Sequence, residues 1–341
     1  MSVSAVVAVA CIAGIAVTAV SGLSIIPFLG RIEFGNSFRP FGKNQPVPSM
    51  GGIMPAIGTV CAVILAVATD KISGGDIVAS GSLIGQEMHT KLWNGLLMAV
   101  SFSLVGMIDD YYKLKSRNNL GLSVKQKTVM QFFVSLAYLT GLYMGMNGMP
   151  YMFVPFFGNC EPGFFYWIAG IVLIYAAVNA VELTDGINGL CGGVTFTAAV
   201  SLGVIAAMKG LFGFSLMSAA VAGSCIGFLF WNTTCAKISL GKTGTMFFAG
   251  ILVALSYAIG CPLILFLSGL SCFVIGSTDI LQIAYYKKTG GKLLLKSAPI
   301  QNHLKINGWS DKKITLTFTF INALGGVAAV AVMYFGGYIL H

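Results

Sequence analysis

Long runs of apolar residues restrict this chain to one class of fold. A helix needs about 20 mostly apolar residues to cross the hydrocarbon core of a membrane. The qualifying runs lie at residues 3–29, 50–69, 92–108, 128–148, 164–181, 193–208, 211–230, 245–260, 262–286 and 314–339. Charged residues are only 9% of the 341 residues, against about 25% in a soluble protein. We therefore predict an all-α membrane protein with about ten transmembrane helices, formed by residues 1–341 as a single polytopic domain.

The first apolar run and the cysteines add two simpler expectations. The run that begins at Val3 follows no basic segment and is too long for a signal-peptide core, so we expect it to remain as the first span. The eight cysteines form no Cys-x-x-Cys pair, and most lie in apolar runs. We expect them to be buried small side chains rather than metal ligands or disulfides.

The basic residues predict how the chain is oriented. If the N-terminus lies outside, all but three of the 20 Lys and Arg residues fall in loops on the opposite side. The three exceptions are Lys71, Lys91 and Lys209. Because basic loops stay in the cytoplasm, we predict that both termini lie outside and that the lysine-rich loops are cytoplasmic.

Several carboxylates lie at or near the cytoplasmic ends of predicted spans, where an ionisable group is costly and is a candidate for function. They are Asp109, Asp110, Glu182 and Asp185, and Asp279 lies within the ninth span. The adjacent carboxylates of Asp109 and Asp110 repel each other, and Mg²⁺ is a common partner for such a pair. The alternative is a solvated helix end with Lys113 nearby.

Three further polar segments lie on the same predicted face, at residues 179–190, 231–245 and 298–309. The first combines amide, carboxylate and hydroxyl groups with Gly186, and such a loop can bind a base or ribose. It can equally be an ordinary helix-ending turn. The run Gly241-Lys242-Thr243 lacks the earlier glycine and the parallel sheet of a nucleotide-triphosphate loop, so we reject that interpretation.

Five motifs occur in order along the chain. They are Pro48-Ser-Met-Gly-Gly52, Asp109-Asp-Tyr-Tyr-Lys113, Asn118-Asn-Leu-Gly-Leu-Ser-Val-Lys-Gln-Lys127, Asn179-Ala-Val-Glu-Leu-Thr-Asp-Gly186, and Ala298-Pro-Ile with His303 and Gly308-Trp309. Together they resemble the prenyl-phosphate sugar-1-phosphate transferases of glycosyltransferase family 4, from about Phe34 to Lys313.

The resemblance implies a Mg²⁺-dependent enzyme of the bacterial plasma membrane. It would transfer phospho-N-acetylmuramoyl-pentapeptide from its UDP-linked precursor to undecaprenyl phosphate and release UMP, forming the first lipid intermediate of peptidoglycan synthesis. The resemblance also implies a homodimer in the lipid bilayer, and we expect no nucleic acid partner.

The resemblance and the residues together suggest roles in the site. We expect catalytic roles for Asp109, Asp110, Lys113, Glu182, Lys242 and His303, with Asp109, Asp110 and Glu182 as metal ligands. We expect substrate-binding roles for Lys43, Lys125, Asn179, Asp185, Gly186, Ile187, Asn188, Asn232, Gln301 and Asn302. The resemblance implies that Lys125 contacts phosphate, and that Asp185, Gly186 and Ile187 line a uridine pocket together with Asn232.

Four departures from the family pattern concern this site. Lys242 stands where the family has a metal-binding Asp, and Glu182 stands where it has an Asn. Asn188 replaces an Asp, and residues 301–303 replace a run of three histidines, of which the last remains. A cation at a ligand position repels Mg²⁺. We hypothesise that Glu182 and Lys242 changed together: either they pair, or Glu182 binds the metal and Lys242 binds the diphosphate.

Three alternatives to this function stay open. The chain can be a paralogue that uses another UDP-sugar, or a catalytically silent relative that binds lipid phosphate or nucleotide. A membrane transporter belongs to a different class, which the glycine-rich spans and Asp279 permit. Its binding site would be expected near the membrane midplane, whereas the acids of this chain gather at one face.

Overall fold

Helices form almost all of the regular structure in the computed structural model, which describes residues 2–35, 46–75, 77, 83–116, 121–145, 152–233 and 236–338. The α-helices are α1 (Val3–Phe34), α2 (Ile53–Ile72), α3 (Leu83–Lys115), α4 (Val124–Gly145), α5 (Phe165–Glu182), α6 (Leu190–Met208), α7 (Phe212–Leu229), α8 (Gly241–Ala258), α9 (Leu265–Ser268), α10 (Leu270–Lys288), α11 (Ile300–Ile306) and α12 (Asp311–Phe335). A 3-10 turn, η1 (Pro262–Ile264), precedes α9, and a short antiparallel hairpin joins β1 (Met152–Val154) to β2 (Gly158–Cys160).

Each predicted span overlaps a helix or a bent pair of helices, which confirms the all-α membrane fold. Among the described residues, α1 to α7 and α12 are the eight helices long and apolar enough to cross a membrane. The pair formed by Pro262–Ser268 and Leu270–Lys288 is a ninth candidate, bent by 85°. The predicted count of ten also includes α8, which is not among the helices that length and composition identify as spans.

The bend after α9 differs from the continuous ninth span predicted over 262–286. Asn322 on α12 stabilises this break. Its side-chain amide forms hydrogen bonds with backbone groups on both sides of Gly269. The side chain accepts a hydrogen bond from the Ser271 backbone N–H at 3.0 Å and donates to the Ser268 carbonyl at 2.9 Å. An internal amide thus replaces helical bonds that the break removes.

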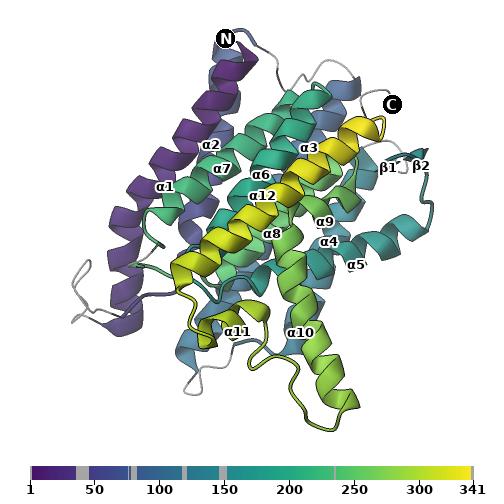
Figure 1. Ribbon diagram of the computed structural model, residues 1–341. Helices are drawn as coiled ribbons and strands as arrows, with labels where there is room; N and C mark the ends of the chain where they lie inside the picture. The colour runs from purple at the N-terminus through teal and green to yellow at the C-terminus, as the bar shows by residue number, and fades with distance from the viewer. Residues whose placement is uncertain are drawn as a thin grey trace.

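Helix α8 lies at the centre of the bundle (Figure 1) and packs against α2, α3, α5, α6 and α7. All of its residues are buried except Lys242. Small residues allow the close contact with α3. A Cβ atom on Gly106 would lie only 2.2 Å from the Lys242 carbonyl oxygen, and one on Gly250 would lie 2.9 Å from Ala99 Cα. Lys242 is therefore the polar end of a buried helix.

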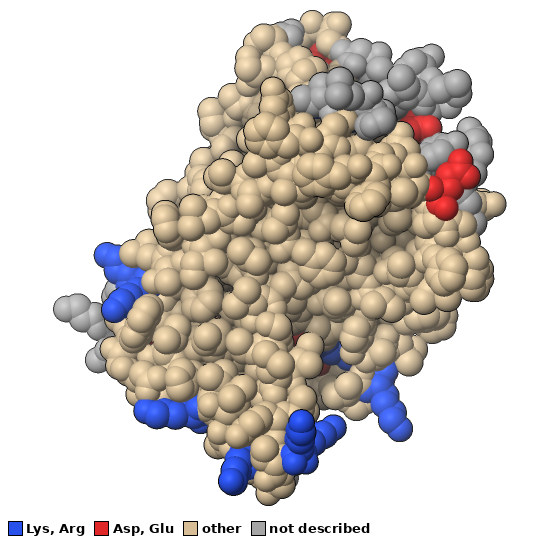
Figure 2. Space-filling model, turned by 45° about the vertical axis from the view of Figure 1, so that its right-hand side comes forward, with Lys and Arg blue, Asp and Glu red and all other residues tan. Residues whose placement is uncertain are grey.

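The two ends of the bundle differ in their charges. The start of α1, the end of α12 and the β1–β2 hairpin all lie at the upper end of the bundle in Figure 1. The hairpin is tied there by backbone hydrogen bonds from Phe153 N–H to the Gly260 carbonyl and from Phe156 N–H to the Gly336 carbonyl. In Figure 2 the visible Lys and Arg side chains lie in the lower half of the molecule. This separation matches the predicted gathering of basic loops, whereas their cytoplasmic location stays a prediction.

Candidate active site

Lys242 joins carboxylates from two other helices at the point where α3 and α5 end and α8 begins. Its Nζ lies 2.6 Å from Asp109 Oδ2 and 3.5 Å from Glu182 Oε1. The Asp109 side chain is fully buried, whereas the Lys242 side chain is 34% exposed. The hypothesised pairing of Glu182 with Lys242 is therefore present in the structure. We call these three residues, together with Lys127, the ion cluster.

Lys127 is the member of the ion cluster that the sequence did not single out. Its Nζ forms an ion pair with Glu182 Oε2, so Glu182 lies between two ammonium groups. In this region of the chain, the sequence singled out Lys125, as a phosphate-binding residue. The Lys125 side chain is exposed at the start of α4. Two residues along a helix correspond to a rotation of about 200°. Only one of the two lysines can therefore point inward.

Asp110 bonds to the N-terminus of α8 and not to a charged side chain. Its carboxylate accepts hydrogen bonds from the backbone N–H of Lys242 at 3.2 Å and of Thr243 at 2.9 Å, and from Thr243 Oγ1 at 2.8 Å. Gly241 begins the helix with a φ of 68°, which favours glycine. A carboxylate at a helix N-terminus satisfies free N–H groups and the positive end of the dipole. The adjacent Asp109 and Asp110 thus have separate positive partners.

Glycines bring the surrounding backbone close to the ion cluster. A Cβ atom on Gly52, in the segment that begins α2, would lie 2.0 Å from the Gly244 nitrogen. A Cβ atom on Gly121 would lie 2.7 Å from Asp109 Oδ1, the same oxygen that accepts a hydrogen bond from Leu122 N–H at 2.7 Å. The first sequence motif therefore packs against the first turn of α8, and the third packs against the Asp109 carboxylate.

Asp185 lies in the loop between α5 and α6, near the carboxylates of the site. Its burial, and then the negative charges of Asp110 and Glu182, raise the pKa of the Asp185 carboxyl to about 7. The exposed Lys113 acts in the opposite direction. Asp185 therefore lies within the electrostatic influence of Asp110, Glu182 and Lys113.

Asn232 fixes the same loop through its side-chain amide. Its Oδ1 accepts a hydrogen bond from Gly189 N–H at 2.8 Å, and its Nδ2 donates to the Ile238 carbonyl at 2.7 Å. Within this loop the Ile187 side chain is buried, and the Asn188 side chain is exposed. The amide of Asn232 is thus engaged by the backbone, and its contribution to a ligand site would be to position the loop.

Gln301 connects helix α11 to this loop. Its Nε2 donates to the Leu183 carbonyl at 2.7 Å, while its buried Oε1 has no hydrogen-bond partner among the described residues. A Cβ atom on Gly186 would lie 3.5 Å from Asn302 Oδ1 and 3.6 Å from Gln301 Nε2. The structure therefore places the amides of Gln301 and Asn302 beside Gly186, on the predicted nucleotide side of the site.

His303 bonds to nearby residues of its own segment, whereas Asn179 bonds within α5 and also donates to Gln131 Oε1 on α4, at 3.5 Å. His303 Nδ1 accepts from the Lys296 backbone N–H at 3.1 Å, and its Nε2 lies 2.9 Å from Asn307 Nδ2. Asn179 Nδ2 donates to the Tyr175 carbonyl one helical turn earlier, at 2.7 Å. The structure does not show either side chain bonded to the ion cluster, and Lys43 lies outside the described residues.

The carboxylates do not fit the magnesium site predicted from the sequence. Mg²⁺ requires near-octahedral oxygen ligands. Asp109 and Glu182 contact Lys242, and Asp110 accepts from the N-terminus of α8. Within the part of the chain that the structure describes, no group of three or more His, Cys, Asp or Glu residues is placed to hold a metal ion. We therefore derive no chemical step through a metal.

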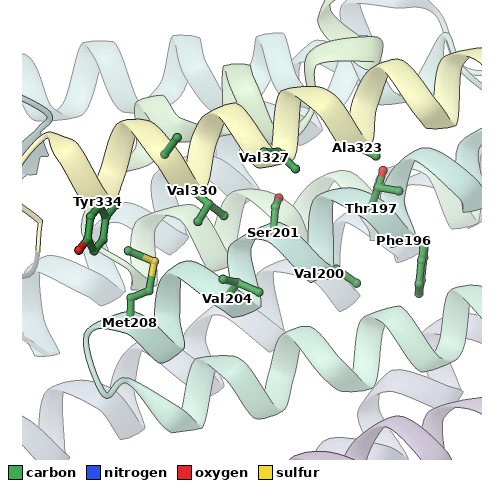
Figure 3. Close-up of a pocket in the computed structure, with 12 residues that line it drawn as sticks. Phe196, Thr197, Val200, Ser201, Val204, Met208, Ala323, Val327, Val330 and Tyr334 are labelled. Atoms are coloured by element: carbon green, nitrogen blue, oxygen red, sulfur yellow. The ribbon is translucent and has the colours of Figure 1, made fainter.

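The apolar groove in Figure 3 lies apart from these charges. It has a volume of about 660 Å³ and runs between α6 and α12, where Val200, Val204 and Val330 point into it. Apolar side chains provide nearly all of its lining. Such a surface suits hydrocarbon rather than phosphate, so this groove is not a candidate for phosphate chemistry.

Known proteins match this chain over almost its whole length. The sequence model of glycosyl transferase family 4 matches residues 92–260. A phospho-N-acetylmuramoyl-pentapeptide-transferase of Listeria monocytogenes is 31% identical over 91% of this chain and 93% of the relative. Enzymes of the same name from Halalkalibacterium halodurans and Heliobacterium modesticaldum are 30% and 32% identical, over 92% and 89% of this chain and 93% and 91% of the relatives.

These matches confirm the family suggested by the five motifs. They extend across the elements that form the ion cluster, since α4, α5, α8 and most of α3 lie within the region matched by the family model. The apolar helices and these bacterial relatives together make the chain a multi-pass protein of the plasma membrane. The chain belongs to the phospho-N-acetylmuramoyl-pentapeptide-transferases, within glycosyl transferase family 4.

Proposed function

We propose that this protein transfers phospho-N-acetylmuramoyl-pentapeptide from its UDP-linked precursor to undecaprenyl phosphate, which forms the first lipid intermediate of peptidoglycan synthesis. The observation that carries the proposal is the ion cluster, in which α3, α4, α5 and α8 contribute charges at one end of an apolar bundle. A lipid phosphate at the membrane surface and a water-soluble nucleotide can meet only at such an end. The relatives that match the whole chain are named for this transfer.

The reaction exchanges one phosphoanhydride partner for another. An oxygen of the lipid phosphate attacks the phosphorus linked to the sugar, the bond from that phosphorus to the bridging oxygen breaks, and UMP leaves with the electron pair. Such a transfer depends on alignment and on neutralising phosphate charge. In this site the ammonium groups of Lys242, Lys127 and Lys113 supply positive charge, and Asp109 fixes the position of Lys242.

The nucleotide end of the donor fits the loop after α5. Gly186 gives its backbone room beside the amides of Gln301 and Asn302, and the buried Oε1 of Gln301 can accept a hydrogen bond. A uracil base offers an N–H donor and two carbonyl acceptors, which such amides can pair. We expect Asp185 to contribute a carboxyl group there, with Asn232 holding the loop in place.

Orientation and assembly complete the proposal. The basic end faces the cytoplasm, where the UDP-linked donor is made, and both termini lie outside. Two copies of the chain form a homodimer in the membrane. The mass of the detergent-solubilised protein, corrected for bound detergent, tests the dimer independently of activity.

Transfer of label from donor to lipid tests the function. Purified protein in lipid vesicles receives undecaprenyl phosphate and UDP-N-acetylmuramoyl-pentapeptide that carries label in the sugar. Labelled lipid is the expected product. Label transferred only from another UDP-sugar would assign the chain to a divergent paralogue. A folded protein that binds UDP but transfers nothing from any UDP-sugar would be a silent binding relative, and the proposed function would be wrong.

A further inference from the structure

The charges of the ion cluster balance without an added cation. Asp109 is fully buried, and a buried carboxylate needs a nearby positive group. Lys242 supplies it at 2.6 Å. Glu182 is paired with both Lys127 and Lys242, so the two carboxylates face two ammonium groups. Asp110 has separate compensation from the N-terminus of α8. Within the ion cluster itself, the two carboxylates and two ammonium groups leave no excess negative charge to attract a divalent cation.

The oxygen atoms of the cluster are also committed to other partners. Asp109 Oδ1 accepts from Leu122 N–H, and its Oδ2 contacts Lys242 Nζ. Glu182 uses one oxygen for each lysine. A metal bound between Asp109 and Glu182 would have to enter the space beside Lys242 Nζ, where like charges repel. Moving Lys242 away would leave Asp109 buried beside a metal with few further oxygen ligands.

The Lys242 ammonium group can still contact an anionic ligand. A lysine ammonium has three N–H donors, and the two carboxylates account for two of them. The Lys242 side chain is 34% exposed, so its remaining donor can reach a phosphate oxygen. Its position is fixed by Asp109, which reduces the conformational freedom that binding must remove.

We infer that Lys242 takes the place of a divalent cation in this site, so that the protein binds a nucleoside diphosphate, and transfers its sugar phosphate, without Mg²⁺. The inference deepens the proposed function and rests on it for the transfer step. The binding step is independent of it. The positive charge is then the Lys242 ammonium group, and its location is set by the Asp109 and Glu182 carboxylates.

Affinity for UDP, with and without Mg²⁺, tests the inference in the full-length detergent-solubilised protein. Titration calorimetry compares the dissociation constant in excess EDTA with that in millimolar Mg²⁺. We expect the two values to agree within about twofold for the native chain. A loss of about tenfold or more in EDTA, restored by Mg²⁺, would overturn the inference.

Two variants separate the role of Lys242 from general effects of charge. Lys242→Asp adds a carboxylate next to Asp109 and Glu182, so UDP binding should become about tenfold tighter with Mg²⁺ than with EDTA. Lys305→Asp makes the same change of charge on an exposed side chain of α11, and it should stay insensitive to Mg²⁺. Because Mg²⁺ also binds free UDP equally in every sample, the difference between variants reports the protein.

Direct binding of Mn²⁺, followed by its electron paramagnetic resonance signal, gives a readout without nucleotide. The native chain should leave Mn²⁺ free, and Lys242→Asp should bind it. Tight Mn²⁺ binding by the native chain, or a folded Lys242→Asp protein that ignores the metal in both experiments, would contradict the inference. Mg²⁺-independent UDP binding without transfer would instead reject the proposed function, and with it the transfer step of this inference, and would leave the binding step standing.

Discussion

Asp110 is the residue whose removal should most directly disturb the start of α8. Its carboxylate accepts two backbone N–H groups and the Thr243 hydroxyl in a buried setting. Asp110→Ala should lower the free energy of unfolding by about 1–3 kcal/mol, because buried donors lose their acceptor. Asp110→Asn keeps an acceptor oxygen and should cost less. Thermal unfolding of the purified protein in detergent measures both changes.

Asp311→Asn is the matched control for Asp110. Asp311 pairs with Lys305 on the surface, where both side chains are exposed. An exposed ion pair contributes less than about 1 kcal/mol, so this variant should unfold near the temperature of the native chain. Equal losses for Asp110→Ala and Asp311→Asn would show that Asp110 has no special part in α8.

The residues of the ion cluster differ in how far sequence could identify them. Asp109 and Glu182 stand out because charged groups beside apolar spans are costly, and Lys242 stands out because it occupies the position of an Asp in the family pattern. Lys127 did not stand out, since it is one of several lysines in its region of the chain. Lys127 and not Lys125 reaches the cluster because of the direction in which each side chain leaves α4 and because of the position of Glu182. Neither of these can be predicted from residue spacing alone.

The contact between the segment that begins α2 and the first turn of α8 depends on Gly52. A Cβ atom there would lie 2.0 Å from the nitrogen and 2.1 Å from the Cα of Gly244, so backbone would have to move. Gly52→Ala should destabilise the protein by about 1–3 kcal/mol and weaken UDP binding, because α8 carries Lys242. Thermal unfolding and UDP titration check these two effects.

Gly276→Ala provides the comparison at another helix contact. A Cβ atom on Gly276 would lie 3.4 Å from Ala180, an ordinary van der Waals distance. Alanine favours a helix over glycine by up to about 1 kcal/mol, so this variant should be neutral or slightly more stable. A Gly52→Ala protein that behaved like Gly276→Ala would contradict the close packing at α8.

Asn322 should be essential to the bent pair formed by α9 and α10. Asn322→Leu would leave the Ser271 N–H and the Ser268 carbonyl without their partner at the bend. We expect a loss of about 1–3 kcal/mol in thermal unfolding. Leu324→Ala, at an exposed position of the same helix, should change stability by less than about 0.5 kcal/mol. A similar response of both variants would argue against the role of Asn322.

The lengths of the apolar runs identified the membrane-spanning helices but not the positions where those helices break. The turn at Gly260-Cys261-Pro262 was predicted because one crossing cannot hold 42 residues, and α8 indeed ends before it. The bend at Gly269 lies in an unbroken apolar run. It is supported by an amide 51 residues away from Ser271, and such a long-range partner has no local signal.

The orientation of the whole molecule can be tested through a native cysteine. Cys160 is exposed in β2, in the hairpin that lies at the same end as the start of α1 and the end of α12. We predict that this end faces outward, so a membrane-impermeant maleimide should label the protein in intact cells, and Cys160→Ser should remove the label. Lys288→Cys in that background should react only after the membrane is permeabilised. The reverse pattern would invert the proposed topology.

Release of UMP tests the central claim most directly. Reconstituted protein is given UDP-N-acetylmuramoyl-pentapeptide in excess EDTA, with or without undecaprenyl phosphate, and UMP is measured over time. We predict UMP release that requires the lipid phosphate and persists in EDTA, because Lys242 is held within the site by Asp109 and Glu182. A folded protein that binds UDP but releases no UMP in either EDTA or Mg²⁺ would contradict the claim that this site transfers phosphate.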